Sequence, residues 1–268
     1  MARYGFWETV KPVWQATFRP VWNWTAPGRK ATLGAVEVSG SLSGVTWNVA
    51  GTVGAIDVQG PVDVQGPVDD WTLVGAGDLQ SPQAGDVGVA NVTVEGTIGT
   101  LRAQAWNAGV IEAQTAKSVV ITGDLKTDVP GDFGASVLLT GNSDSRKALG
   151  RAKIAGQITG GTWLVDGSVG TLRAGSTSAD WRANFSGSLK KLKIRGDFSG
   201  TLAAASCDVV HIAGDVLSGV LLVGANLGAD ADQFLAGSFG AVKIGGQVIA
   251  TTRAAGLDPA TDRRFFSG

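Results

Sequence analysis

Gly51-Thr-Val-Gly-Ala-Ile-Asp-Val58 is the first copy of a phrase that returns along this 268-residue chain. Self-similarity of this kind marks a stacked array, because one unit is too small to bury its own apolar face. The phrase therefore predicts a repeat architecture. The later copies are Gly96-Thr-Ile-Gly-Thr-Leu-Arg-Ala103, Gly167-Ser-Val-Gly-Thr-Leu-Arg-Ala174, the looser Gly187-Ser-Leu-Lys-Lys-Leu-Lys-Ile194, and Gly237-Ser-Phe-Gly-Ala-Val-Lys-Ile244.

Apolar and polar residues alternate over short runs, as in Ile56-Asp-Val58 and Leu192-Lys-Ile194. This period of two predicts short strands with one inward and one outward face. The copies begin 45, 71, 20 and 50 residues apart, which is close to one, two or three coils of about 20–25 residues. We expect an all-β fold, a single-stranded, right-handed parallel β-solenoid (β-helix) of roughly ten coils and about 45 Å.

The irregular spacing predicts loops inserted between the coils. The segments 77–86, 141–150 and 226–236 are rich in turn formers, so we expect the insertions there. Residues 144–152 have a composition that would also suit a short helical turn.

Composition places limits on the class of protein. Glycine is frequent, at 40 residues, yet the hydrophobic share of 44% is too high for a disordered linker. Lys and Arg number 22 against 23 Asp and Glu, so the chain as a whole lacks the basic excess of a nucleic-acid binder. We expect no nucleic-acid partner, and with a single cysteine no intrachain disulfide can form.

The chain divides into three parts: an aromatic and basic N-terminal arm (1–33), a Gly-rich solenoid (34–251) and a polar C-terminal tail (252–268). The arm combines tryptophan with a net charge of +4, which is typical of segments that contact a membrane interface or a protein partner. Pro12 and Pro20 argue against a continuous helix. A cap on the first coil is the alternative role. The residues expected to dock are Phe6, Trp7, Trp14, Phe18, Arg19, Trp22 and Trp24.

Residues for catalysis or metal binding are sparse. Asp124, Asp132, Asp197 and Asp215 each follow a glycine, which is typical of turn formers rather than of paired catalytic carboxylates. His211 and Cys207 are single, so neither a Ser-His-Asp site nor a metal cluster is indicated, and we expect His211 to face outward from a strand. We predict no catalytic residue, no cofactor, no metal and no small-molecule substrate.

Five tryptophans are spread along the body of the chain. Thr46-Trp47 and Thr162-Trp163 occupy the same place, a few residues before the repeated glycine. This equivalence predicts either packing at a corner of the coil or an exposed apolar stripe, and we favour the corner.

Some phrases resemble a known class of proteins. Leu192-Lys-Ile-Arg-Gly-Asp-Phe-Ser-Gly200 and Thr252-Arg-Ala-Ala-Gly-Leu-Asp-Pro259 resemble the Gly-rich β-solenoid repeat proteins of planctomycetes and other high-GC bacteria, many of them at cell surfaces. The resemblance covers about 34–259. A weaker resemblance is to bactofilins, cytoplasmic β-helix proteins that polymerise at membranes and whose coils are more regular. The resemblance implies the fold.

These observations predict a non-catalytic accessory subunit that acts as a scaffold. We expect residues 1–24 to dock it onto a membrane surface or onto a membrane-bound protein complex. Such a complex could be of the respiratory or photosynthetic type. A self-assembling cytoskeletal or cell-surface protein and a carbohydrate-active β-helix are the alternatives. The sequence contains neither a secretory signal nor the ~18–20 apolar residues that span a bilayer. We therefore expect a peripheral membrane protein on the cytoplasmic side, with the cell surface as the alternative.

Overall fold

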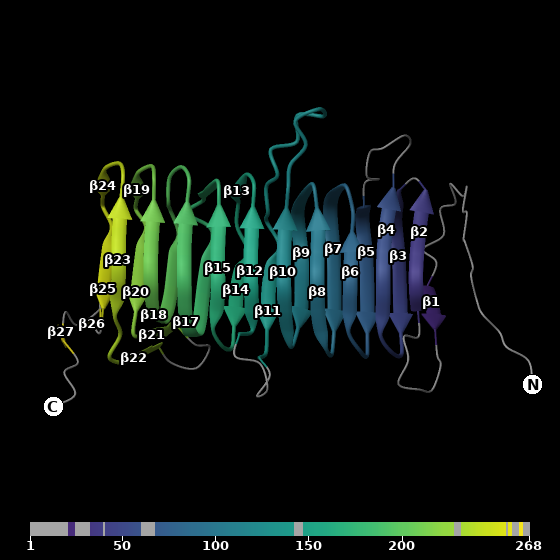
Figure 1. Cartoon of the computed structure of the whole chain (residues 1–268), viewed down its shortest axis with the longest axis horizontal. Coiled ribbons are helices and arrows are strands. Elements are labelled where there is room, and N and C mark those ends of the chain that lie inside the picture. The colour runs from purple at the N-terminus through teal and green to yellow at the C-terminus, as the bar shows by residue number, and fades with distance from the viewer. Residues whose placement is uncertain are drawn as a thin grey trace, which may run out of the picture.

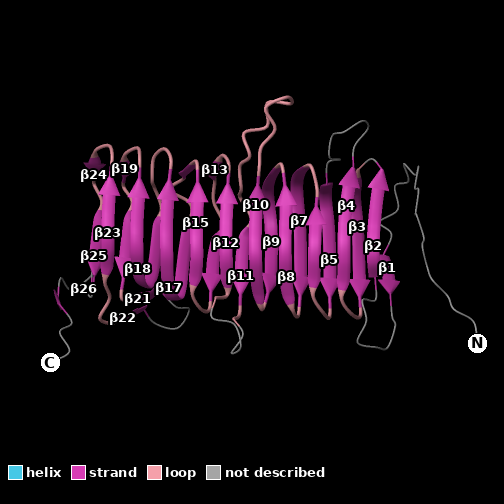
Figure 2. Cartoon of the chain, viewed as in Figure 1, coloured by secondary structure: helices cyan, strands magenta, loops and turns pink. Residues whose placement is uncertain are grey.

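The computed structural model describes residues 21–24, 33–39, 41–59, 68–141, 147–227, 232–255, 257–258 and 263–264. These residues are all-β and include no helix. Nineteen of the 27 described strands belong to one large parallel sheet that is almost closed around the long axis of the molecule, a parallel β-solenoid-like arrangement (Figures 1 and 2). Successive strands alternate between two faces, and each strand pairs with the next strand on its own face.

We call the first set of strands face A. It begins with β1, which pairs with β3, and ends with β25, which pairs with β20, so the sheet extends beyond 34–251 at both ends. The strands of face A are β1 (Val21–Trp24), β3 (Leu42–Val49), β5 (Val68–Gly75), β7 (Asp86–Val94), β9 (Ala105–Ala113), β11 (Ser136–Leu139), β14 (Thr162–Val165), the first part of β17 (Arg182–Ile194), the first part of β18 (Thr201–Ile212), β20 (Val220–Val223) and β25 (Thr252–Ala255).

Face B is the second set, and its strands run opposite to those of face A in Figure 1. Short strands on a third side complete some coils: β13 (Gln157–Ile158) with β16 (Ser176–Thr177), and β19 (Val216–Leu217) with β24 (Val248–Ile249). The strands of face B are β2 (Leu33–Ser39), β4 (Val53–Gln59), β6 (Leu79–Gln83), β8 (Thr97–Ala103), β10 (Thr115–Ile121), β12 (Leu149–Ile154), β15 (Val169–Ala174), the second parts of β17 and β18, and β23 (Phe239–Ile244).

All five copies of the repeated phrase lie on face B, in β4, β8, β15, β17 and β23. The register places their third residues in one ladder across the coils, which confirms the predicted repeat. Steric exclusion explains the glycine at the fourth position of the phrase. A Cβ at Gly99 or Gly170 would lie 2.2 or 2.1 Å from the carbonyl oxygen of the neighbouring coil, closer than real Cβ atoms come.

The predicted insertions are partly correct. Segment 226–236 contains an antiparallel hairpin, β21 (Ala225–Leu227) with β22 (Asp232–Phe234), as expected of an insertion. The prediction for 77–86 is wrong, because β6 lies within it and pairs with both β4 and β8. The helical turn expected over 144–152 is wrong for its last residues, since β12 begins at Leu149, and 142–146 lie outside the described residues.

One projecting loop was not anticipated. Between β10 and β11 the chain forms a turn that Asp124 and Val129 close with two backbone hydrogen bonds of 2.8 and 2.9 Å. This turn is the projection near the middle of Figure 1. A second short hairpin, β26 (Leu257–Asp258) with β27 (Arg263–Arg264), follows β25.

Aliphatic side chains and buried aromatic rings fill the space between the faces. Trp47 and Trp163 lie at the same inward position of face A, in one ladder with Leu73, and both are fully buried. Burial excludes the exposed stripe, but both tryptophans lie within strands, so the favoured position at a corner of the coil is wrong. A column of edge-to-face rings joins Phe133, Trp163, Trp181 and Phe198, with centroids 5.6, 5.8 and 6.3 Å apart.

Candidate docking surfaces

Most of the predicted docking arm lies outside the described residues: Phe6, Trp7, Trp14, Phe18 and Arg19. Trp22 and Trp24 belong to β1, where the backbone register aligns them with Trp47 and Val49 of β3. Val21 is therefore the first described residue of the parallel sheet.

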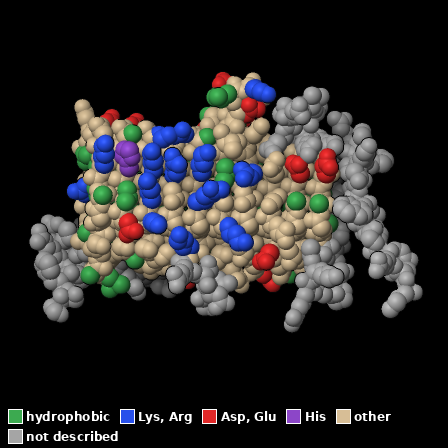
Figure 3. Space-filling model, in the orientation of Figure 1, with side chains coloured by type: hydrophobic (Ala, Val, Ile, Leu, Met, Phe, Trp, Pro, Cys, Tyr) green, Lys and Arg blue, Asp and Glu red, His purple; other side chains and the backbone are tan. Residues whose placement is uncertain are grey.

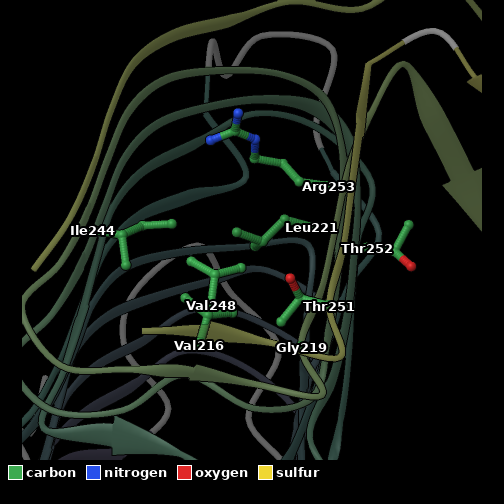
Figure 4. A pocket seen from close by; sticks show the side chains of 8 residues that line it. All are labelled: Val216, Gly219, Leu221, Ile244, Val248, Thr251, Thr252 and Arg253. Atoms are coloured by element: carbon green, nitrogen blue, oxygen red, sulfur yellow. The ribbon is translucent and has the colours of Figure 1, made fainter. Parts of the chain in front are cut away.

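At the other end of the rod no described residue covers the last coil, and we call this the open end. The last coil places Phe239, Val242 and Ile244 in the ladders of buried Cys207, Val210 and Ile212, but it has no further coil above it within the described residues. A hollow of about 340 Å³ lies there, lined by Val216, Leu221, Val248 and Arg253 among others (Figure 4).

Arg253 is unusual within this open end. Its backbone aligns with that of the buried Leu221, and its side chain extends across the inside of the coil (Figure 4). Val248 and Ile249 beside it are 57% and 48% exposed. The end is thus an apolar rim that carries one cation.

The turn aspartates bind backbone rather than forming paired carboxylates. The Asp215 N–H donates to Asp197 Oδ1 over 2.8 Å, and the Gln247 N–H donates to Asp215 Oδ1 over 2.7 Å. Asp132 Oδ1 accepts the Gln157 N–H in the same way, over 2.7 Å. Each carboxylate thereby ties one coil to the next, which confirms the predicted turn role for these three residues.

Asp124 also has a local turn role. Its Oδ1 accepts the Lys126 N–H over 2.8 Å, and this hydrogen bond is the main reason that the pKa of Asp124 lies below its ordinary value. The carboxylate is therefore ionised near neutral pH, which does not suit a general acid.

His211 and Cys207 lie on opposite sides of β18. His211 is half-buried and occupies an outward position between Lys193 and Lys243, as predicted. Cys207 points into the core, is only 2% exposed, and its pKa is raised to about 11, chiefly by burial. A buried thiol with a raised pKa is a poor nucleophile.

A row of cations that the sequence analysis missed runs along the outside of face B. Arg173 aligns with Lys153 on one side and Lys193 on the other, and Figure 3 shows Lys and Arg gathered on this face. The seven coils from β8 to β23 give the row a length of about 29 Å, at ~4.8 Å per step. We call it the basic row; its ladder positions are Arg102, Val120, Lys153, Arg173, Lys193, His211 and Lys243.

Further cations surround the basic row on the same strands. Arg151 and Lys191 lie two residues before it, and Arg151 Nε donates to Ser118 Oγ over 2.8 Å. Lys117 and Lys190 are exposed nearby. Among the described strands β8, β10, β12, β15 and β23 and the second parts of β17 and β18, Asp208 is the one acidic residue.

The signal for this row was present in the sequence. The seventh residue of the repeated phrase is Arg102, Arg173, Lys193 or Lys243 in four copies, and Asp57 in the first. Because that residue alternates with inward apolar ones, a shared outward face could have been inferred. Toward the N-terminal end the same ladder continues through Gln83 and Asp57 to Glu37, so its charge changes sign along the rod.

Other classes of site have little support. No group of three or more His, Cys, Asp or Glu that could hold a metal ion occurs among the described residues. The described part of the chain also has no helix both long and apolar enough to cross a bilayer. Comparison with protein-family models, with curated proteins and with solved structures finds no match to this chain. Any functional inference therefore depends on the chemistry of its surfaces.

Proposed function

We propose that this chain is a non-catalytic structural subunit, a rigid scaffold docked onto a membrane-bound protein complex through its N-terminal arm. In this proposal the body is a single-stranded, right-handed parallel β-solenoid. The right-handed sense is supported by the strong preference of parallel crossover connections for that hand. The arm includes Phe6, Trp7, Trp14, Phe18 and Arg19.

One observation carries the scaffold role: the coils are tied to one another both inside and at their turns. Inside, the edge-to-face column crosses several coils, and each buried large side chain contributes about 1.5–3 kcal/mol. At the turns, Asp132, Asp197 and Asp215 bind the backbone of the following coil. These three carboxylates are thus engaged in holding the rod together, rather than paired across a cleft as in a glycosidase.

The docking role rests on the sequence of the arm and on the place where it joins the rod. Trp and Lys/Arg together suit a membrane interface or a protein hot spot. The arm directly precedes β1 in the sequence, and β1 pairs with β3. Binding through the arm would leave the faces of the rod accessible.

Co-purification from native cells tests this proposal. The full chain should be recovered in a detergent-extracted membrane complex, and the variant Trp7→Ala, Trp14→Ala should not be. Trp22 is left in place because it belongs to β1. Unchanged thermal unfolding of the variant would show that the rod is intact. Recovery of both proteins in the same complex, or of the full chain as a free monomer, would contradict the docking role.

A second candidate is end-to-end assembly into a cytoskeletal or cell-surface filament, and the open end favours it. The last coil has apolar inward residues without a neighbour above them within the described chain, and Lys243 on its outside holds the ladder position that Glu37 holds in β2. Stacking β23 of one copy on β2 of the next would pair these opposite charges. We rank this candidate second because Arg253 places an inward charge at the end of the sheet, and such a charge opposes edge-to-edge stacking.

Sedimentation of the purified full chain separates the two candidates. Filaments or concentration-dependent oligomers that disappear in Val248→Lys would favour end-to-end assembly, since Val248 lines the open end and is exposed. A monomer at all concentrations would exclude it. The matched control is Val89→Lys, an exposed valine on face A.

A further inference from the structure

The basic row gathers positive charge on one face of a chain whose positive and negative charges nearly balance. The formal net charge is −1, yet the outward positions of face B from β8 to β23 combine many cations with a single carboxylate, Asp208. Like charges at neighbouring ladder positions repel, which is unfavourable for folding. A negatively charged partner best explains why this surface gathers cations despite their mutual repulsion.

The shape of the surface limits what that partner can be. Most of the cations on the outside of this sheet lie in the basic row, with Lys153 and Arg173, and two more, Arg151 and Lys191, lie in the neighbouring ladder on either side of Thr171. Positions two residues apart on a strand are about 7 Å apart, and the row is about 29 Å long. The array is therefore two-dimensional and calls for negative charge spread over a plane.

Single-stranded nucleic acid fits this array poorly. Proteins that bind it stack the bases on aromatic side chains, and the described outward positions of these strands include no Trp, Tyr or Phe. A duplex is a cylinder, so its phosphates curve away from a flat face, whereas the phosphates of a lipid leaflet stay in one plane.

An anionic leaflet fits both the charge and the shape. Every acidic phospholipid presents a phosphate at one plane, and clusters of four to eight Lys and Arg bind such surfaces at about 1 kcal/mol per cation. The exposed large apolar side chains of the described chain (Val74, Val89, Leu125, Leu164, Leu235, Val248 and Ile249) all lie off these strands. Contact would thus be electrostatic and at headgroup level, without insertion of side chains into the hydrocarbon.

We propose that face B, through the basic row, lies flat on a leaflet containing anionic phospholipids. This contact is separate from the N-terminal arm and holds the rod parallel to the membrane plane. The acidic end of the same ladder, at Glu37 and Asp57, faces the same way and would be repelled by the leaflet, so the C-terminal two thirds of the rod carries the adhesion.

Vesicle sedimentation with the full chain tests this proposal. We expect binding to vesicles of equal parts phosphatidylcholine and phosphatidylglycerol, weak binding to phosphatidylcholine alone, and loss of binding as salt rises. The variant Arg173→Gln, Lys193→Gln removes two cations from the row, which should weaken binding roughly thirty-fold at about 1 kcal/mol each. The control Lys126→Gln, Arg182→Gln removes the same charge from the projecting loop and from face A, and should stay within about twofold.

Several results would overturn the proposal. Equal binding to neutral and anionic vesicles, or equal loss in the two double variants, would remove the basic row as the contact. If Arg173→Gln, Lys193→Gln weakens binding to duplex DNA but not binding to vesicles, face B would be assigned to nucleic acid. Vesicle binding lost in Trp7→Ala, Trp14→Ala but kept in the row variant would place the lipid contact in the arm. Failure to recover a membrane complex from cells would contradict the docking role alone and leave the vesicle result intact.

Discussion

Face A and face B enclose the same interior but differ on the outside. Inward positions on both faces carry buried aliphatic or aromatic residues, such as Leu73 on face A and Leu101 on face B. Outward positions on face A are mostly Thr, Asn, Ser and small apolar residues, whereas those on face B from β8 onward are rich in Lys and Arg. Folding explains the shared interior. It does not explain the difference outside, which points to a partner on one face.

The largest effect should come from breaking the shared interior. Trp163→Ala removes a fully buried ring that contacts Phe133 and Trp181, so it should lower the free energy of unfolding by about 3–5 kcal/mol. The adjacent Leu164 is 43% exposed on the outside of face A, and Leu164→Ala should cost no more than about 0.5 kcal/mol. Urea unfolding followed by circular dichroism measures both, and similar losses would contradict the assignment of inside and outside.

The next effect concerns the glycine that recurs on face B. Gly170→Ala would place a Cβ 2.1 Å from the Gly150 carbonyl oxygen, so the coils must separate locally at a cost of about 1–3 kcal/mol. Gly34 occupies the equivalent place in β2 but has open space around it, and Gly34→Ala should therefore be tolerated. Equal melting temperatures for the two variants would mean that the repeated glycine has another cause.

This contrast also shows what the sequence could reveal. The phrase was recognisable because the same close approach of neighbouring coils recurs on face B and requires the second glycine in four of the five copies, whereas the looser copy has Lys190 there. Face A has no such phrase, since its inward ladder varies from Trp47 to Leu73 to Val92 and only the alternation of apolar residues marks it.

Strand β6 shows where local signals fail. Leu79-Gln-Ser-Pro-Gln83 reads as a loop because Pro82 has no N–H to donate to a ladder. Pairing with β4 nevertheless makes it a strand, and it pairs with β8 at Leu79 and Gln83, on either side of Pro82. Tertiary pairing overrode local preference here.

The basic row shows a different limit. Arg102, Lys153 and Arg173 are unevenly spaced in sequence because the loops between their strands differ in length. Their alignment depends on the register of β8, β10, β12 and β15. The repeated phrase contained Arg102 and Arg173 but not Lys153, and the continuity of all three into one surface became visible only in the structure.

A smaller effect should come from the turns that join the coils. Asp215→Ala removes the acceptor of the Gln247 N–H and should cost about 1–2 kcal/mol, whereas Asp215→Asn keeps an acceptor oxygen and should lose less. Thermal unfolding distinguishes them. If Asp215→Ala melts like the unsubstituted protein, the turn carboxylates are not structural, and a chemical role for them would have to be reconsidered.

The smallest effect should reverse the usual sign, because the basic row is a liability for the isolated protein. Arg173 lies between Lys153 and Lys193, so Arg173→Gln relieves repulsion on both sides and should raise the free energy of unfolding by about 0.2–1 kcal/mol at low salt. The gain should shrink as salt screens the charges. On face A, Arg182 lies between Thr162 and Thr201, and Arg182→Gln should change little. A variant that folds more stably yet binds anionic vesicles less would show that face B gives up stability for its partner. A loss of stability in Arg173→Gln would show instead that the row is favourable within the fold itself, and the contrast between the two faces would then need no partner to explain it.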